Sequence, residues 1–222
     1  MEIVWLGHSC FRIRGKEATI VTDPFDKTLG YPMRKPTANI ITVSHSHPQH
    51  SFVAGVAGNP RVVSRPGEYD IANVFINGIA TFHDKDKGAQ RGKNTVFFME
   101  IDEVKVCHLG DLGHVPTTEQ VEQMSGTDIL MVPVGGGSTL DAAAAAETIG
   151  LLEPRLVMPM HYKTEVVKME LDPLDRFLKQ MGVKEVETQP KLNVSKSNLP
   201  PETRVLVLDY RRDNIQEPNK TG

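Results

Sequence analysis

Short apolar segments bounded by turn residues fill the first half of the chain. Each is four to seven residues long, is rich in Val, Ile, Phe and Thr, and ends near Gly, Asn, Asp or Ser, as β-strands do. The segments span residues 2–7, 10–14, 18–23, 39–44, 61–64, 73–78, 79–82 and 95–101. The first half is therefore predicted to be mostly sheet.

The second half alternates strands with helices. Thr117 and Gln120 have the spacing of a capping box, and Asp172 precedes a proline that suits the first position of a helix stopped by Gly182. Helices are predicted over 117–124, 139–152 and 173–182, and strands over 103–108, 128–134, 155–160 and 204–210. Sheets in both halves with helices mainly after the midpoint predict a layered α/β sandwich with helices outside two sheets.

Length and composition agree with one domain over residues 1–210. The 222 residues are 39% hydrophobic, which is enough for a buried core without a stabilising metal or disulfide. Residues 211–222 are polar, contain Pro and Gly, and are predicted to be a disordered tail.

Charge and cysteine content narrow the class of protein. With 25 basic and 28 acidic side chains and no long block of either sign, nucleic acid is not expected as a partner. Cys10 and Cys107 lie in strand-like segments and are expected to be buried, reduced thiols. No signal peptide or membrane-spanning run is recognised, so a cytoplasmic protein that binds a small molecule is expected, with a homo-oligomer left open.

Three histidines follow the strand predicted at 39–44. His45, His47 and His50 occupy the sequence HSHPQH, a short loop that a rigid strand holds in place. Imidazole is a common ligand of divalent metals, and alternate side chains of such a loop can point to one centre. This spacing predicts a metal site.

Further candidate ligands stand where other strands end. His83 ends the segment GIATFH, His108 and Asp111 lie in CHLGD, and His161 ends RLVMPMH. Ends of strands at one edge of a sheet can converge in space. For His108, a hydrogen bond within a turn is an equally good interpretation.

These motifs together resemble the metallo-β-lactamase superfamily. HSHPQH, the downstream His83, HLGDLG and PMHY occur in the order typical of that family, and WLGHSCFRI, TDPF and VPVGG resemble its small bacterial metal-dependent hydrolases, which are related to ascorbate-6-phosphate lactonases. The resemblance covers residues 1 to about 190. It implies a four-layer αββα sandwich of two mixed sheets with outer helices.

The resemblance also implies a set of ligands. His45, His47 and His83 would bind a first metal ion, His50 and His161 a second, and Asp111 would bridge them, with metal-bound hydroxide as the nucleophile. Zinc is the expected metal, with manganese or iron as alternatives. Asp111 and residue 49 would be the catalytic positions.

Residue 49 departs from the family pattern, which has an aspartate there. The amide of Gln49 brings no charge, so affinity at the second site should fall, and the enzyme could work with one ion. Asp23, Asp84 or Asp86 could supply a replacement carboxylate, although Asp23 is equally suited to accept backbone N–H groups in a turn. Loss of catalysis is the other interpretation of Gln49.

Other residues could support the site. His8 and His108 could orient ligands, or could be structural, and Tyr162 could contact substrate or simply pack. The basic loop, residues 83–94, carries four cations that could close over an anionic substrate or simply be solvated: Lys85, Lys87, Arg91 and Lys93.

The sequence thus favours a metal-dependent hydrolase that acts on a small anionic ester, lactone or phosphodiester. A metal-binding sensor or interaction protein without turnover is the alternative, with Gln49 as its main support. A nuclease is disfavoured by the charge and length of the chain.

Overall fold

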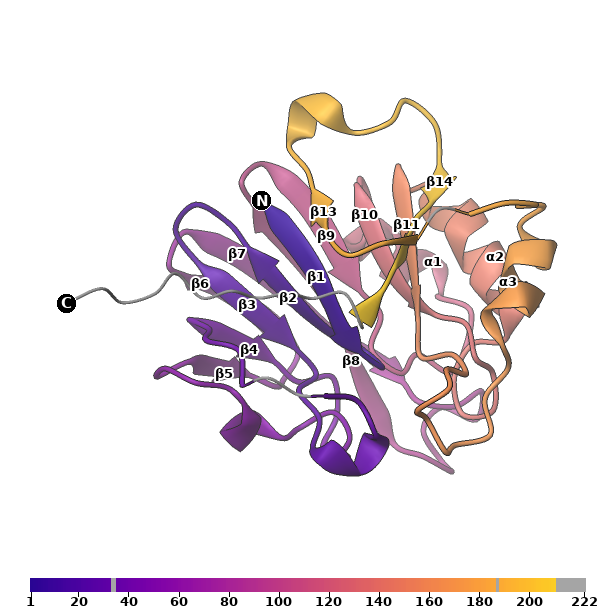
Figure 1. Cartoon of the computed structure of the whole chain (residues 1–222), viewed down its shortest axis with the longest axis horizontal. Coiled ribbons are helices and arrows are strands. Elements are labelled where there is room, and N and C mark those ends of the chain that lie inside the picture. Colours follow the sequence, from indigo (N-terminus) through magenta and orange to yellow (C-terminus); the bar gives the residue numbers. More distant parts are fainter. Residues whose placement is uncertain (33–34, 187, 211–222) are drawn as a thin grey trace.

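The computed structural model describes residues 1–32, 35–186 and 188–210, and the tail predicted at 211–222 lies outside this range. Two large β-sheets face each other, with the three α-helices gathered on one side of the molecule (Figure 1). The predicted α/β sandwich of two mixed sheets is therefore confirmed.

The first sheet has six strands in the order β13-β1-β2-β3-β4-β5. Their bounds are β1 Glu2–Gly7, β2 Cys10–Arg14, β3 Thr19–Thr22, β4 Ile40–Thr42, β5 Arg61–Val63 and β13 Leu192–Asn193. Strands β1, β2 and β3 pair antiparallel, whereas β3, β4 and β5 pair parallel. As a result β1, β3 and β4 run in one direction and end at the same edge.

The second sheet has seven strands in the order β14-β11-β10-β9-β8-β7-β6. Their bounds are β6 Gly67–Ile71, β7 Val74–Phe82, β8 Lys93–Ile101, β9 Val104–His108, β10 Ile129–Pro133, β11 Leu156–Met160 and β14 Arg204–Val205. Strands β9, β10 and β11 are parallel, and β7 shares their direction because β8 is antiparallel to both β7 and β9. A separate two-stranded sheet joins β12 Thr188–Gln189 to β15 Val207–Leu208.

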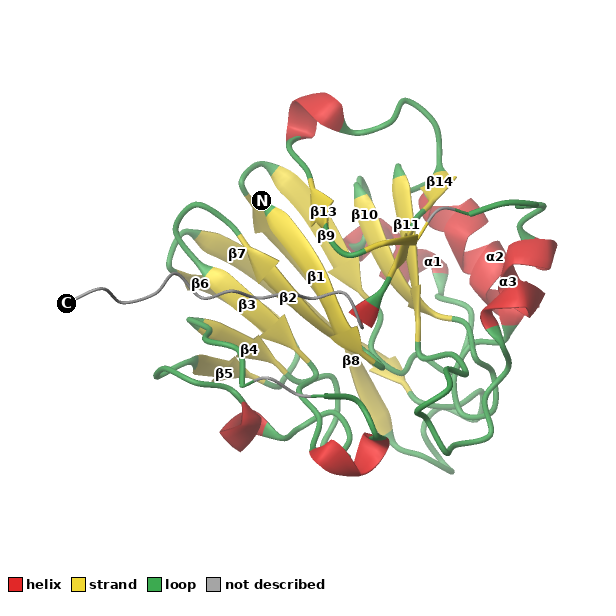
Figure 2. Ribbon diagram, in the orientation of Figure 1, coloured by secondary structure: helices red, strands yellow, loops and turns green. Residues whose placement is uncertain are grey.

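Helices are few and follow β9 in the chain, as predicted (Figure 2). They are α1 Thr118–Gln123, α2 Ala142–Leu152 and α3 Leu174–Gln180; the 3-10 turns are η1 Lys27–Leu29, η2 Val53–Gly55 and η3 Lys196–Asn198. The capping box of Thr117 and Gln120 is present. In the described part of the chain, no helix has the length and apolar character needed to cross a membrane.

Several predicted boundaries need correction. The helix predicted from residue 139 begins at Ala142, because Asp141 caps it by accepting the Ala144 N–H. Pro173 is the N-cap of α3 and not its first residue. The predicted strand 204–210 is two strands, β14 and β15, in different sheets, and the segments 73–78 and 79–82 form the single strand β7.

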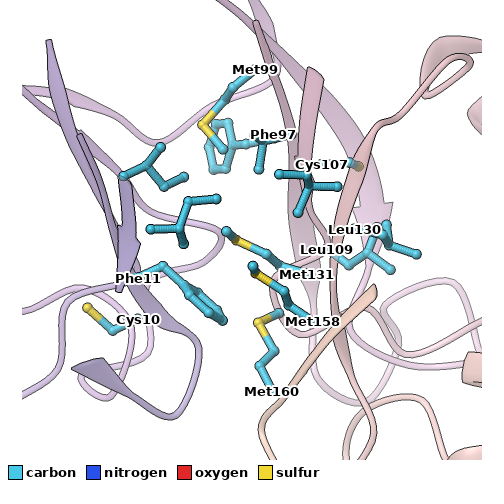
Figure 3. Packing of buried hydrophobic residues seen from close by; sticks show 14 of the residues in the cluster. Cys10, Phe11, Phe97, Met99, Cys107, Leu109, Leu130, Met131, Met158 and Met160 are labelled. Carbon is cyan, nitrogen blue, oxygen red and sulfur yellow. The ribbon is translucent and has the colours of Figure 1, made fainter. Parts of the chain in front are cut away.

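Apolar side chains from both sheets fill the space between them. Figure 3 shows Phe11 of β2 opposite Met131 of β10 and Met158 of β11, all of them buried. Methionine side chains adapt to irregular gaps, so they suit a seam between two twisted sheets. Cys10 and Cys107 are buried free thiols, as predicted.

Candidate metal centre

The residues with metal-binding chemistry follow the ends of strands that share one direction in each sheet. His8 follows β1, Asp23 follows β3 and His45 follows β4, while His83 follows β7 and His161 follows β11. Because the two sheets face each other, these ends meet at one edge of the sandwich. The fold thus gathers side chains that are far apart in the sequence.

Asp111 lies at the centre of the cluster. Its Oδ2 is 3.2 Å from His50 Nε2, 3.3 Å from His83 Nε2, 3.4 Å from His161 Nε2 and 3.9 Å from His45 Nε2. Two groups of potential ligands result: His45, His83 and Asp111 form one, and His8, His50 and His161 form the other. Three buried imidazoles and the half-buried one of His45 around one carboxylate oxygen give the site both nitrogen and oxygen donors.

Asp23 fixes the orientation of two of these histidines. Its fully buried carboxylate accepts a hydrogen bond from His50 Nδ1 at 3.0 Å and another from Ser44 Oγ at 2.6 Å. Ser44 Oγ in turn lies 2.9 Å from His45 Nδ1. Both rings therefore use Nδ1 in these hydrogen bonds and turn Nε2 toward Asp111, as in metal sites where a carboxylate orients the ligand.

Backbone groups and amides hold the remaining members. His83 Nδ1 lies 3.0 Å from the carbonyl oxygen of Ser138, which places its proton on Nδ1 as well. Asn94 Oδ1 accepts the backbone N–H of Asp111, and Ser9 Oγ donates to Asp111 Oδ1 at 3.4 Å. The Asp111 carboxylate is therefore held in place before any ligand binds.

His8 belongs to the cluster and not to its surroundings. Its Nε2 lies 3.2 Å from His50 Nε2, and its ring centroid is 4.2 Å from that of His161. The His8 carbonyl oxygen accepts hydrogen bonds from Trp5 Nε1 and from the His161 backbone N–H. The sequence left the role of His8 undecided; the structure places its ring against two predicted ligands.

His47 lies farther out than the other two histidines of its loop. The His47 ring is exposed, its centroid is more than 6 Å from those of His45 and His50 (6.1 and 6.3 Å), and it belongs to neither group of ligands. Its Nδ1 accepts the backbone N–H of half-buried Gln49 at 3.3 Å. A metal role for His47 thus stays a prediction.

The three aspartates considered as substitutes for residue 49 are engaged elsewhere. Asp23 orients His50, and the backbone N–H that it accepts belongs to Ser44, which follows β4, and not to the turn after β3 that the alternative interpretation proposed. Asp84 accepts four backbone N–H groups of the basic loop, and exposed Asp86 pairs with Gln90. None of them is in the two groups of ligands found among the described residues.

His108 and Tyr162 have structural contacts. His108 Nε2 lies 2.8 Å from the Ser9 carbonyl oxygen, and the ring packs edge-on against Phe11, so this histidine fastens β9 to the turn after β1. Tyr162 is buried with its ring centroid 5.2 Å from that of Trp5. These contacts agree with the structural alternatives for both residues.

Opposing effects set the charges of the cluster. Burial would raise the pKa of Asp111, but the nearby imidazoles of His161 and His50 hold that pKa well below its usual value. Burial would lower the pKa of His50, yet the carboxylates of Asp111 and Asp23 raise it to about 10. For His45 burial dominates and lowers the pKa to about 4, so this imidazole is neutral at pH 7.

A cavity of ≈ 950 Å³ opens beside His45. Its walls include Arg91 and Lys93 of the basic loop and Arg65 from the connection between β5 and β6. Lys85 and Lys87 are exposed and are not among its lining residues. Of the four cations of the basic loop, two therefore line the cavity and two do not. Arg65, which belongs to no motif recognised in the sequence, is a third cation in the cavity wall.

Comparisons with known proteins place the chain in a family. Residues 2–161 match the model of the β-lactamase superfamily domain. The chain belongs to the metallo-β-lactamase superfamily. A crystal structure from Thermotoga maritima, assigned to the Zn-dependent hydrolases of that superfamily, is 42% identical with a TM-score of 0.78, covering 93% of this chain and 97% of the other.

Curated relatives carry similar names. A UPF0173 metal-dependent hydrolase of Thermoplasma volcanium is 29% identical over 203 residues, which is 78% of this chain and 88% of the relative. A UPF0173 protein of Pyrococcus abyssi is 30% identical over 183 residues, which is 74% of this chain and 84% of the relative. The predicted superfamily and hydrolase class are thereby confirmed; the relation to ascorbate-6-phosphate lactonases stays a prediction.

Proposed function

We propose that this metallo-β-lactamase superfamily member hydrolyses a small anionic ester, lactone or phosphodiester with one or two divalent metal ions, zinc foremost. The observation that carries the proposal is the convergence of four histidine Nε2 atoms on the Asp111 carboxylate. His45, His83 and Asp111 would hold one ion, with His47 as the further ligand that the resemblance implies, and His50, His161 and Asp111 would hold the second.

The donor atoms fit a metal ion. The Nδ1 atoms of His45, His50 and His83 are taken up by hydrogen bonds, so their Nε2 atoms face a negative oxygen. At 3.2–3.9 Å these atoms need a proton or a cation among them, and a divalent ion would take the place of the proton that the raised pKa of His50 keeps there. Separations near 3.3 Å also equal the edge of a tetrahedron with metal–ligand bonds of about 2.0–2.1 Å.

A bound divalent ion would lower the pKa of water and polarise the scissile group of the substrate. The protein's own contribution is orientation. Asp23 and Ser44 keep His45 and His50 in the tautomer that offers Nε2, and Ser9 and Asn94 keep Asp111 in place. Gln49 can donate or accept a hydrogen bond but brings no charge, so it would position substrate or water and would not take up a proton.

The charge of the cavity supports an anionic substrate. Arg65, Arg91 and Lys93 line the same hollow as His45, so a negative group bound by these cations would lie within reach of the metal ligands. Arginine in particular suits carboxylate and phosphate through paired hydrogen bonds. Substrate selection is thus assigned to the cavity and bond cleavage to the histidine cluster.

The test compares matched loop variants. The zinc-loaded protein is assayed with bis(p-nitrophenyl) phosphate, with a neutral p-nitrophenyl ester, and with lactones with and without a carboxylate. Arg91→Ala with Lys93→Ala should raise KM for the anionic substrates and leave that for the neutral ester unchanged. Lys85→Ala with Lys87→Ala, which removes the same charge outside the cavity, should change neither.

The same assay tests the alternative that Gln49 supports. If the protein binds metal and cleaves none of these substrates, while Gln49→Asp gains activity, the metal-binding sensor is favoured over the hydrolase. Equal effects of both double variants would mean that overall charge, and not the cavity, governs binding.

A further inference from the structure

We infer that His8 is a metal ligand, and that His8, His50, His161 and Asp111 form a complete second metal site without a carboxylate at position 49. The inference rests on the proposed function only in taking the cluster as a metal centre. It assigns to His8 a direct bond to the ion in place of the orienting or structural role between which the sequence did not decide.

The distances around His50 carry the argument. His50 Nε2 lies 3.2 Å from His8 Nε2 and 3.2 Å from Asp111 Oδ2, while His161 Nε2 lies 3.4 Å from the same oxygen. These three separations are close to the distance of about 3.3 Å between ligand atoms of a tetrahedral zinc ion with bonds of about 2.0–2.1 Å. His8, His50 and His161 each offer an atom within 4.8 Å of the others.

A structural role explains the position of His8 less well. A buried histidine that only supports the fold normally uses its ring nitrogens in hydrogen bonds to backbone or carboxylate groups. His8 is 1% exposed, and its Nε2 faces the Nε2 of His50, whereas the Nε2 of His108 meets a backbone carbonyl oxygen. The Nδ1 atoms of His8, His108 and His161 all have no partner among the described residues, so the distinction rests on Nε2. The single Nε2–H of a protonated His50 cannot serve both the His8 ring and Asp111 well, whereas one cation can bind all three.

The backbone is also arranged to present this ring. His8 has a positive φ of 53°, and His161 has one of 51°. Residues other than glycine rarely adopt this conformation, and such strain gathers at functional sites. The His8 carbonyl oxygen ties the two segments together through the His161 N–H at 3.3 Å.

The donor set predicts which metal this site prefers. Three imidazoles and one carboxylate favour zinc, cobalt or nickel over manganese, which prefers oxygen ligands. An aspartate at position 49 would have shifted the balance toward oxygen. Gln49 therefore marks a change in metal preference and not a lost site.

The experiment measures metal content and affinity without any substrate. Wild type, His8→Asn and His108→Asn are stripped with chelator, reloaded with zinc, and analysed by elemental analysis and by competition with a chromophoric chelator. Asparagine tolerates the left-handed backbone at position 8. His108 is the matched control, because it is equally buried in the same region but contacts the Ser9 carbonyl oxygen.

Wild type and His108→Asn should bind two zinc ions, and His8→Asn should bind one tightly. The second ion should bind more than about 100-fold more weakly in His8→Asn, which exceeds the 10–100-fold typical of residues that only orient a ligand. Should His8→Asn fold poorly, His8→Gly with added imidazole provides the test, because only a ligand role predicts that imidazole restores the second ion and its cobalt absorption bands.

The inference would be overturned if His8→Asn bound two zinc ions with the affinity of wild type. It would also be overturned if the wild-type protein bound only one zinc ion. Binding of two ions that depends on His8, without hydrolysis of any substrate, would uphold the inference while refuting the proposed function. The two failures are thus distinguishable.

Discussion

Asp23→Asn should weaken binding of both metal ions. The carboxylate accepts the Ser44 N–H on Oδ1 and both Ser44 Oγ and His50 Nδ1 on Oδ2. An amide has one oxygen, so an Asn that keeps the bond to the Ser44 N–H presents its NH₂ to His50. That imidazole must then move its proton to Nε2, the atom that faces Asp111, or turn away.

The contacts of Asp23 set the expected loss of metal affinity. Loss of a partner that orients a ligand typically costs 10–100-fold in metal affinity, or about 1.4–2.7 kcal/mol. Asp23 reaches His50 directly and His45 through Ser44, so each ion should lose about that much. Ser44→Ala breaks only the path to His45 and should weaken only one ion.

The assay is zinc competition with a chromophoric chelator at pH 7.5, with circular dichroism to establish that the variants are folded. Unchanged affinity for both ions in Asp23→Asn would refute the argument. If Ser44→Ala lost the same affinity for both ions as Asp23→Asn, the whole effect would come from the contact of Ser44 with His45. The hydrogen bond between Asp23 and His50 would then have no role in metal binding.

Three further changes test other parts of the structure. Gly110→Ala should lower the free energy of unfolding in urea by about 1–3 kcal/mol, because Gly110 has a φ of +57° and an added Cβ would lie 2.5 Å from the Cβ of Ser44. Gly150→Ala in α2 is the control: an added Cβ there meets no atom, so this variant should not be destabilised. Because burial raises the pKa of Cys107 to about 12, this thiol should resist alkylation at pH 8 until the protein is denatured, and rapid labelling of the native state would contradict its burial. Asp84→Ala should speed tryptic cleavage in the basic loop severalfold, because four backbone N–H groups lose their acceptor; an unchanged rate would mean that other contacts order the loop.

The sequence pattern predicts the strands well where they are long and buried. Strands β1, β2, β8 and β10 fall where apolar runs predict them. Strand β6 was missed because GEYDI is partly exposed and alternates too weakly, and β12 and β13 have two residues each. Such short strands form because tertiary contacts place them, and no local pattern specifies that.

The residues of the site could be predicted only in part, because some of their contacts also depend on tertiary structure. Ligand chemistry at strand ends marks His45, His83 and His161, and the sheet topology explains why these ends meet. The contact of His8 with His50 depends on a left-handed turn after β1, which the sequence does not specify. Arg65 enters the cavity from a loop whose course is set by the packing of two sheets.

The cluster draws on both sheets, with His8, His45 and His50 from the first and His83, Asp111 and His161 from the second. A chain emerging from the ribosome therefore has the donors of the first site once residue 111 has been made, but lacks those of the second until residue 161, roughly 8–30 s after initiation at 5–20 residues per second. Before residue 83 the chain offers mainly the histidines of HSHPQH, which no folded sheet yet holds in place. The complete arrangement of both groups of donors therefore exists only after the two sheets have packed together, so selectivity for one metal over another is expected of the folded protein and not of the nascent chain.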